Sequence, residues 1–204
     1  MPRANTSPDK TSVARADRDS AARVRVFVGV KAAPEIAREL AQLAAGLENP
    51  PVRPVAPSDI HLTLVPPWDE ASIPDAIERL RLVAGRFGAF SMTFEHVGYG
   101  PRPKRPRLLW ADCAASDEIA ALRAALLQAY GQTDERPFRP HVTLARLRGN
   151  GSAIARKHPI DRELSLTQRV ETVELFQSPP AGASGYRILA SLRLGEIAHG
   201  ASKS

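Results

Sequence analysis

The sequence predicts an α+β protein built from two similar lobes. Segments with the alternation of β-strands outnumber segments with helical spacing, and most of the strands follow one another as a meander. The tetrad His-x-Thr-Leu occurs twice, as HLTL at 61–64 and as HVTL at 141–144, with a predicted helix on either side of each copy. Chance gives one such tetrad in about two chains in a hundred of this length, and two in about two in ten thousand. The repeat therefore indicates two comparable halves, each centred on one His-x-Thr strand.

The elements of the first half are predicted from the spacing of apolar residues and from the prolines that end strands and helices. Val24, Val26, Val28 and Val30 alternate as in a buried strand, and Pro34 suits the first turn of a helix. The expected elements are a disordered tail at 1–22, a strand at 23–30, a helix at 34–47, a short strand at 52–55, a strand at 60–65 that Pro66 and Pro67 stop, a helix at 73–87 and a strand at 90–97.

The second half follows the same signals after a Pro-stiffened basic loop at 101–107, which either contacts phosphates or is a charged connection. Gly149, Asn150 and Gly151 break the chain after the second tetrad. The expected elements are strands at 108–113 and 141–147 with a helix at 117–130 between them, an undefined basic excursion at 152–163, strands at 170–177 and 186–194, and a frayed end at 196–204. Residues 23–195 are expected to form a single bilobal domain.

The composition favours an anionic partner. The 204 residues carry 28 Lys and Arg against 22 Asp and Glu, so that phosphate-bearing substrates or RNA are natural candidates, although the excess could also be solvated surface. No apolar run is long enough to span a membrane and the first residues have no apolar centre, so we expect a cytoplasmic protein. We also expect the protein to be a monomer. Cys113 stands alone, which predicts a buried thiol and no disulfide.

Each tetrad combines a polar pair with an apolar backing. Residues two apart in a strand point to the same face, so each His lies beside its Thr while the alternate apolar residues turn into the core. Two imidazoles facing one another suit a reaction that removes one proton and supplies another, because imidazole titrates near neutrality. In-line cleavage of a phosphodiester needs that acid and base, with Thr63, Thr143 and Arg146 available to the phosphate oxygens.

Other chemistries have less support in the sequence. A zinc site draws three or four ligands, and neither a His-Glu-x-x-His motif nor a Cys pair is present, so no metal is expected. A Ser-His-Asp triad is open in principle, but no Gly-x-Ser-x-Gly occurs. His96, His158 and His199 have no matched partner and are expected to be structural.

Three segments carry a resemblance to a known family: HLTL at 61–64, RPFRPHVTLAR at 136–146 and PRPKRPRLLW at 101–110. The chain resembles, from about 23 to 194, the RNA 2',3'-cyclic phosphodiesterases, formerly described as 2'-5' RNA ligases, within the 2H phosphoesterases. The opening strand RVFVGV and the ending SPPAGASGYRILASLRL are also similar to that family.

The resemblance implies two pseudo-symmetric lobes, each with an antiparallel sheet and helices, around a central cleft with one His-x-Thr strand per lobe and no cofactor or metal. It implies hydrolysis of 2',3'-cyclic phosphates on RNA ends or nucleotides to a 2'-phosphomonoester. Carried over to this chain, His61 is the proton donor and His141 the proton acceptor, and Thr63, Thr143 and Arg146 bind the phosphate.

Substrate range stays open at this point. The sequence departs from many relatives at 65–68, where Val-Pro-Pro-Trp follows the first tetrad. Trp68 and Phe138 could each stack on a base or pack in the core. The alternatives to cyclic phosphate hydrolysis are another 2H phosphodiester, such as a 2'-5' oligonucleotide or ADP-ribose cyclic phosphate, the reverse ligation to a 2'-5' linkage, and a non-catalytic module that binds RNA ends.

Overall fold

The computed structural model describes residues 23–45, 47, 52–102, 104–180, 183 and 185–196. The expected tail at 1–22 lies outside these residues, as do His199 and nearly all of the C-terminal end that we expected to be frayed. The elements are β1 (Val24–Lys31), α1 (Pro34–Ala45), β2 (Val52–Pro54), a 3-10 turn η2 (Pro57–Asp59), β3 (His61–Glu70), α2 (Ile73–Ala84), β4 (Phe90–Gly100), β5 (Leu108–Cys113), α3 (Asp117–Ala129), β6 (His141–Leu147), α4 (Gly151–Lys157), β7 (Arg162–Val170), β8 (Thr172–Gln177) and β9 (Arg187–Arg193).

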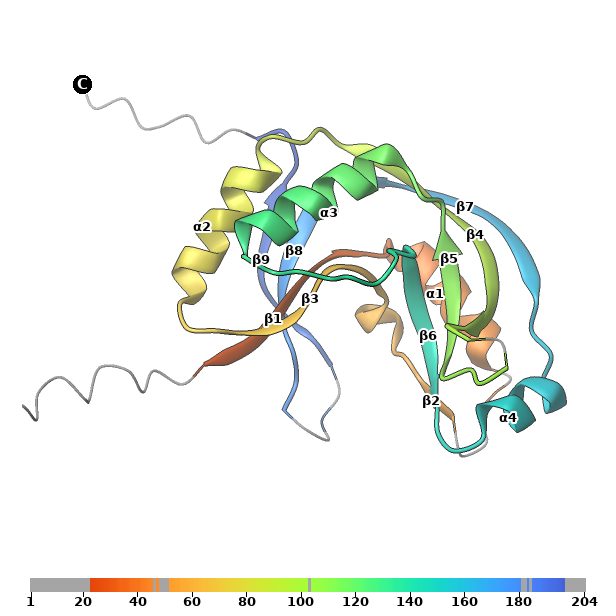
Figure 1. Ribbon diagram of the computed structural model, residues 1–204. Coiled ribbons are helices and arrows are strands. Elements are labelled where there is room, and N and C mark those ends of the chain that lie inside the picture. Colours follow the sequence, from red (N-terminus) through yellow and green to blue (C-terminus); the bar gives the residue numbers. More distant parts are fainter. Residues whose placement is uncertain are drawn as a thin grey trace, which may run out of the picture.

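The nine strands form one curled antiparallel sheet, in the order β7-β4-β5-β6-β3-β1-β8-β9 with β2 beside β6 (Figure 1). The α+β fold class is thus confirmed. The two halves, β7-β4-β5-β6 and β3-β1-β8-β9, meet through the single residue pair Leu62 and Val142. Each half therefore has its His-x-Thr strand at its inner edge, and the two tetrads lie side by side where the sheet bends.

Two helices cross from one half of the sheet to the other. Helix α1 follows β1 but packs against β6 and β2, whereas α3 follows β5 but packs against β3 and α2 (Figure 1). Helix α2 packs against β8 and β9. Ser72 and Ser116 cap α2 and α3 by accepting hydrogen bonds from the backbone N–H groups of Asp75 and Ile119. These exchanged helices hold the two halves in one relative position.

Strand β3 does not stop at the prolines, contrary to expectation. It continues to Glu70, with Pro66 and Pro67 together facing the single residue Phe27 of β1. A bulge of this kind leaves residues of one strand out of the ladder, which suits prolines because they have no N–H to donate. After Leu62, β3 pairs with β1 and no longer with β6. The edge of β3 that faces away from β1 therefore needs no backbone N–H groups at the two prolines.

The segment at 152–163, left undefined by the sequence, holds α4 and the start of β7. Asn150 caps α4 by accepting a hydrogen bond from the N–H of Ala153. Strand β7 (Arg162–Val170) was not expected and lies at the edge of the sheet against β4, whereas the expected strand at 170–177 is β8. Edge strands need only a weak apolar face, which explains why the charged stretch gave no strand signal.

The apolar residues of both tetrads are in the core, as predicted. Leu62 and Leu64 are 1% exposed, and Val142 and Leu144 are fully buried. Cys113 is also buried, and that burial raises the pKa of its thiol. No helix in the described part of the chain is long and apolar enough to cross a bilayer.

Candidate active site

The two His-x-Thr segments lie side by side and antiparallel where β3 pairs with β6. Because Leu62 pairs with Val142 in an antiparallel arrangement, His61 lies nearest Thr143, and His141 lies nearest Thr63. All four side chains line one cavity of about 200 Å³. Arg146, from the far end of β6, lines the same cavity. The structure thus brings together in one cavity all five residues that the family resemblance implies to be catalytic or phosphate-binding.

Both imidazoles are held in the same way by the chain that precedes them. Nδ1 of His61 donates to the carbonyl oxygen of Asp59 at 2.6 Å, and Nδ1 of His141 donates to that of Arg139 at 2.7 Å. A carbonyl oxygen only accepts, so each ring carries its proton on Nδ1 when neutral. Nε2 of each histidine is left as the atom that can take up or release a proton.

His61 stands in an aromatic enclosure. Its ring centre lies 4.8 Å from that of Phe27, 5.0 Å from that of Tyr186 and 5.3 Å from that of Phe176. This burial lowers the pKa of His61, because a charged ring loses its hydration, and the positive charge of Arg146 also lowers it. His61 is therefore neutral at pH 7 in the free protein.

Close packing at His61 also depends on Gly29 of β1. A Cβ atom at this position would stand 2.5 Å from the carbonyl oxygen of Leu62 and 3.5 Å from the ring of His61. Only glycine allows β1 to approach the first tetrad this closely.

His141 has a more polar surrounding. Its ring centre lies 4.2 Å from that of Trp110, and the guanidinium of Arg139 lies over the same indole, 5.2 Å from the ring centre. Asp112 pairs with Arg139 at 3.7 Å. Burial lowers the pKa of His141, and the Asp112 carboxylate acts against this by raising it.

Replacing Asp112 with asparagine should lower the pKa of His141 further below its ordinary value, since the negative charge that favours the imidazolium is lost. The titration of each imidazole by NMR measures this directly. His61 should keep its midpoint, because Asp112 is not among the groups that affect its pKa. Asp69→Asn, an exposed carboxylate on β3, is the matched control and should move neither midpoint. A His141 midpoint that stays in place in Asp112→Asn contradicts this description of the site.

Phe138 and Trp68, the two residues considered for base contacts, lie in different places. Phe138 lines a groove of about 430 Å³ together with Thr63 and His141, and Arg123 covers its ring at 4.4 Å. Trp68 does not line the catalytic cavity or this groove.

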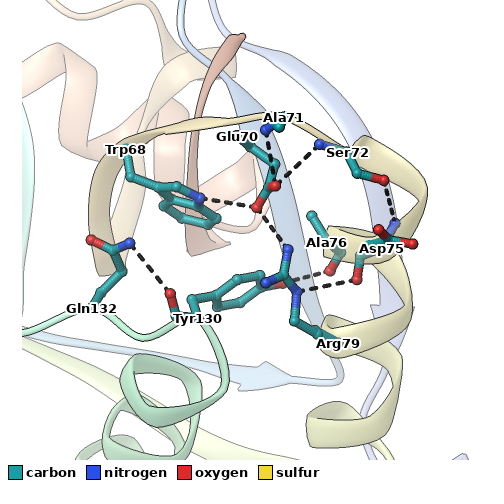
Figure 2. Close-up of polar contacts among 9 residues, drawn as sticks. All are labelled: Trp68, Glu70, Ala71, Ser72, Asp75, Ala76, Arg79, Tyr130 and Gln132. Atoms are coloured by element: carbon teal, nitrogen blue, oxygen red, sulfur yellow. Dashed lines mark hydrogen bonds and ion pairs between the residues drawn. The ribbon is translucent and has the colours of Figure 1, made fainter. Parts of the chain in front are cut away.

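Trp68 belongs to a polar network between β3, α2 and the end of α3 (Figure 2). Its Nε1–H donates to Glu70 at 3.1 Å, and its ring packs 4.7 Å from that of Tyr130. Arg79 pairs with the same carboxylate at 2.8 Å. Trp68 is therefore packed in this network, away from the cavity that holds the histidines.

Several residues of the site were missed by sequence reasoning. Phe27 and Tyr186 enclose His61, while Trp110 and Asp112 surround His141. Phe27, Trp110 and Tyr186 lie in segments that carry the family resemblance, but nothing in those segments marks them as neighbours of the histidines. They reach the histidines through contacts between strands, which no local pattern reports.

A family model described as the 2'-5' RNA ligase superfamily matches residues 32–178. The chain belongs to this superfamily. A Bacillus subtilis member, named RNA 2',3'-cyclic phosphodiesterase, is 31% identical over 134 residues, which are 61% of this chain and 72% of that protein. An Archaeoglobus fulgidus protein of the same name is 27% identical over 138 residues, 65% of this chain and 77% of that protein.

Two solved structures share the fold of this chain. Escherichia coli LigT, crystallised with 3'-AMP, superposes with a TM-score of 0.66 at 26% identity over 85% of this chain and 99% of LigT. Thermus thermophilus TT0787 gives a TM-score of 0.69 at 22% identity over 84% of this chain and 98% of TT0787, which bears on the fold alone.

Proposed function

We propose that this chain hydrolyses 2',3'-cyclic phosphates of RNA ends or nucleotides to 2'-phosphomonoesters, without a metal. The observation that carries the proposal is the cavity where two imidazoles from separate halves of the sheet, both anchored through Nδ1, meet two threonines and an arginine. Superfamily relatives named RNA 2',3'-cyclic phosphodiesterase support the choice of substrate. All of these residues come from one chain, as the expected monomer requires.

The proposed reaction uses the two Nε2 atoms in turn. Nε2 of His141 accepts a proton from water as the water oxygen bonds to phosphorus. Nε2 of His61 donates a proton to the 3' oxygen as its bond to phosphorus breaks. The products are a 2'-phosphate and a free 3'-hydroxyl, and the two histidines have exchanged protonation states.

Thr63, Thr143 and Arg146 are assigned to the phosphate group. Their hydroxyls and guanidinium are donors around one cavity, where they can bind the non-bridging oxygens as charge builds up in the transition state. Fixed donors in a partly enclosed site stabilise this charge more than water does, because they need not reorient during the reaction.

The bound phosphate also determines which histidine is protonated. In the free protein burial keeps both imidazoles neutral, and Arg146 disfavours a proton on His61. A phosphate anion neutralises Arg146 and favours a nearby imidazolium. The substrate thereby supplies the electrostatic condition under which His61 can act as the acid.

Incubation with a 2',3'-cyclic nucleotide in excess EDTA tests the proposal, with the product identified by phosphorus NMR. We expect undiminished turnover and only the 2'-phosphate. In the described part of the chain, His, Cys, Asp and Glu form no group of three or more that could hold a metal ion. Binding without turnover would instead support a module that holds RNA ends. A 3'-phosphate product, or loss of activity with EDTA, would contradict the mechanism.

A further inference from the structure

Two arginines stand opposite one another beside the catalytic cavity. Strand β2 pairs with β6 so that Arg53 faces Arg146 directly. Directly opposed residues on antiparallel strands have Cβ atoms about 4.5–5.5 Å apart, and like charges at such positions destabilise the pair. An uncompensated pair of positive charges in this position is typical of a site that receives an anion.

Neither guanidinium is neutralised by an acidic neighbour. Among the residues that the structure describes, no Asp or Glu oxygen lies within 4.0 Å of the guanidinium nitrogens of Arg53 or Arg146. Arg53 donates one long hydrogen bond, of 3.4 Å, to the carbonyl oxygen of Ala183. Asp59 lines the same region, but its Oδ1 accepts a hydrogen bond from the N–H of Tyr186 at 3.2 Å.

The two arginines differ in the space that they face. Arg146 lines both the catalytic cavity and a second cavity of about 510 Å³, whereas Arg53 lines only the second. Val55, Asp59 and Tyr186 also line both, so the two cavities adjoin along this side. A ligand whose reactive group lies between the histidines can therefore extend past Arg146 toward Arg53.

We propose that the second cavity binds another phosphate of the same substrate, with Arg53 as the residue that selects for it. This inference rests on the proposed function. On a nucleoside 2',3'-cyclic phosphate, the remaining position that carries a phosphate is the 5' oxygen. The preferred substrates are therefore 5'-phosphorylated, either as a free monoester or as the internucleotide diester of an RNA end.

The test compares substrates that differ only at the 5' oxygen. Adenosine 2',3'-cyclic phosphate, its 5'-phosphorylated form and the dinucleotide ApA with a terminal 2',3'-cyclic phosphate are assayed at one low ionic strength. The wild type should have a higher kcat/KM for both extended substrates. Arg53→Ala should reduce this preference about tenfold, as expected when one charged hydrogen bond to phosphate is lost.

Arg148→Ala is the matched control, since it removes an exposed arginine near the end of β6 that lines neither cavity. It should keep the wild-type preference, and circular dichroism melts should show all variants folded. A benefit for the dinucleotide alone assigns the site to the RNA diester, and a benefit for both extended substrates assigns it to the phosphate itself.

Three results would overturn the inference. The wild type could turn over the three substrates equally, or Arg53→Ala could lower all three rates by the same factor, which would place Arg53 on the reactive phosphate. If no substrate is hydrolysed, the proposed function is wrong. Binding of a 5' phosphate is then tested separately, by calorimetric titration with adenosine 2'-phosphate and with adenosine 2',5'-bisphosphate. Equal affinities of the wild type for these two nucleotides would then rule it out.

Discussion

Replacing either His61 or His141 with alanine is expected to lower kcat for a 2',3'-cyclic nucleotide by about a hundred- to ten-thousandfold, as the loss of a general acid or base does. Each ring is anchored through Nδ1, which leaves its Nε2 for proton transfer, and both rings line the shared cavity. The kcat of the double variant should be only slightly lower than that of the less active single variant. The effects of the two substitutions are not additive, because the acid and the base act in one step. Initial rates under saturating substrate measure the effect.

His61 is partly buried between aromatic rings, so its removal also leaves space there. His61→Gln and His141→Gln, which fill most of that space, should lose as much activity while melting near the wild-type temperature. His158→Ala is the control, because this histidine lies beyond the end of α4 and does not line the cavity. Activity that persists in both alanine variants would remove the acid–base assignment.

Arg146→Ala should lower kcat/KM by about a hundred- to a thousandfold, which is typical when one donor to a developing oxyanion is removed. The residue is exposed and lines the cavity from the end of β6, so the fold should be unaffected. Because its positive charge lowers the pKa of His61, the same variant should raise that pKa toward its ordinary value. Steady-state kinetics and the NMR titration of His61 measure these two effects.

Arg146→Lys separates charge from geometry. Lysine keeps the charge but lacks the planar pair of donors, so it should recover only part of the activity while restoring the low pKa of His61. Arg148→Ala should change neither quantity. An Arg146→Ala enzyme with full activity would show that the guanidinium does not contact the reacting phosphate.

The sequence was most informative where the pattern is local. A His, an apolar residue, a Thr and a Leu in a strand present two polar groups on one face and bury the others, whatever lies around them. Leu62 and Val142 are buried for this reason. The same pattern could not show that Gly29, Trp110 and Asp112 pair with Thr63, Thr143 and His141, respectively. Strand β7 and the continuation of β3 past its prolines also escaped prediction, because edge pairing and a bulge relax the usual demands on sequence.

By itself, the sequence determined that two His-x-Thr strands exist, that each has an apolar back and that the chain is an α+β protein. Only the tertiary structure decided that these strands adjoin through one residue pair, that His61 is enclosed by Phe27 and Tyr186, and that Arg53 stands opposite Arg146. The physical reason is the range of the interactions. Alternation along a strand is set within a few residues, whereas register and enclosure depend on contacts between segments some 34 to 125 residues apart in the chain.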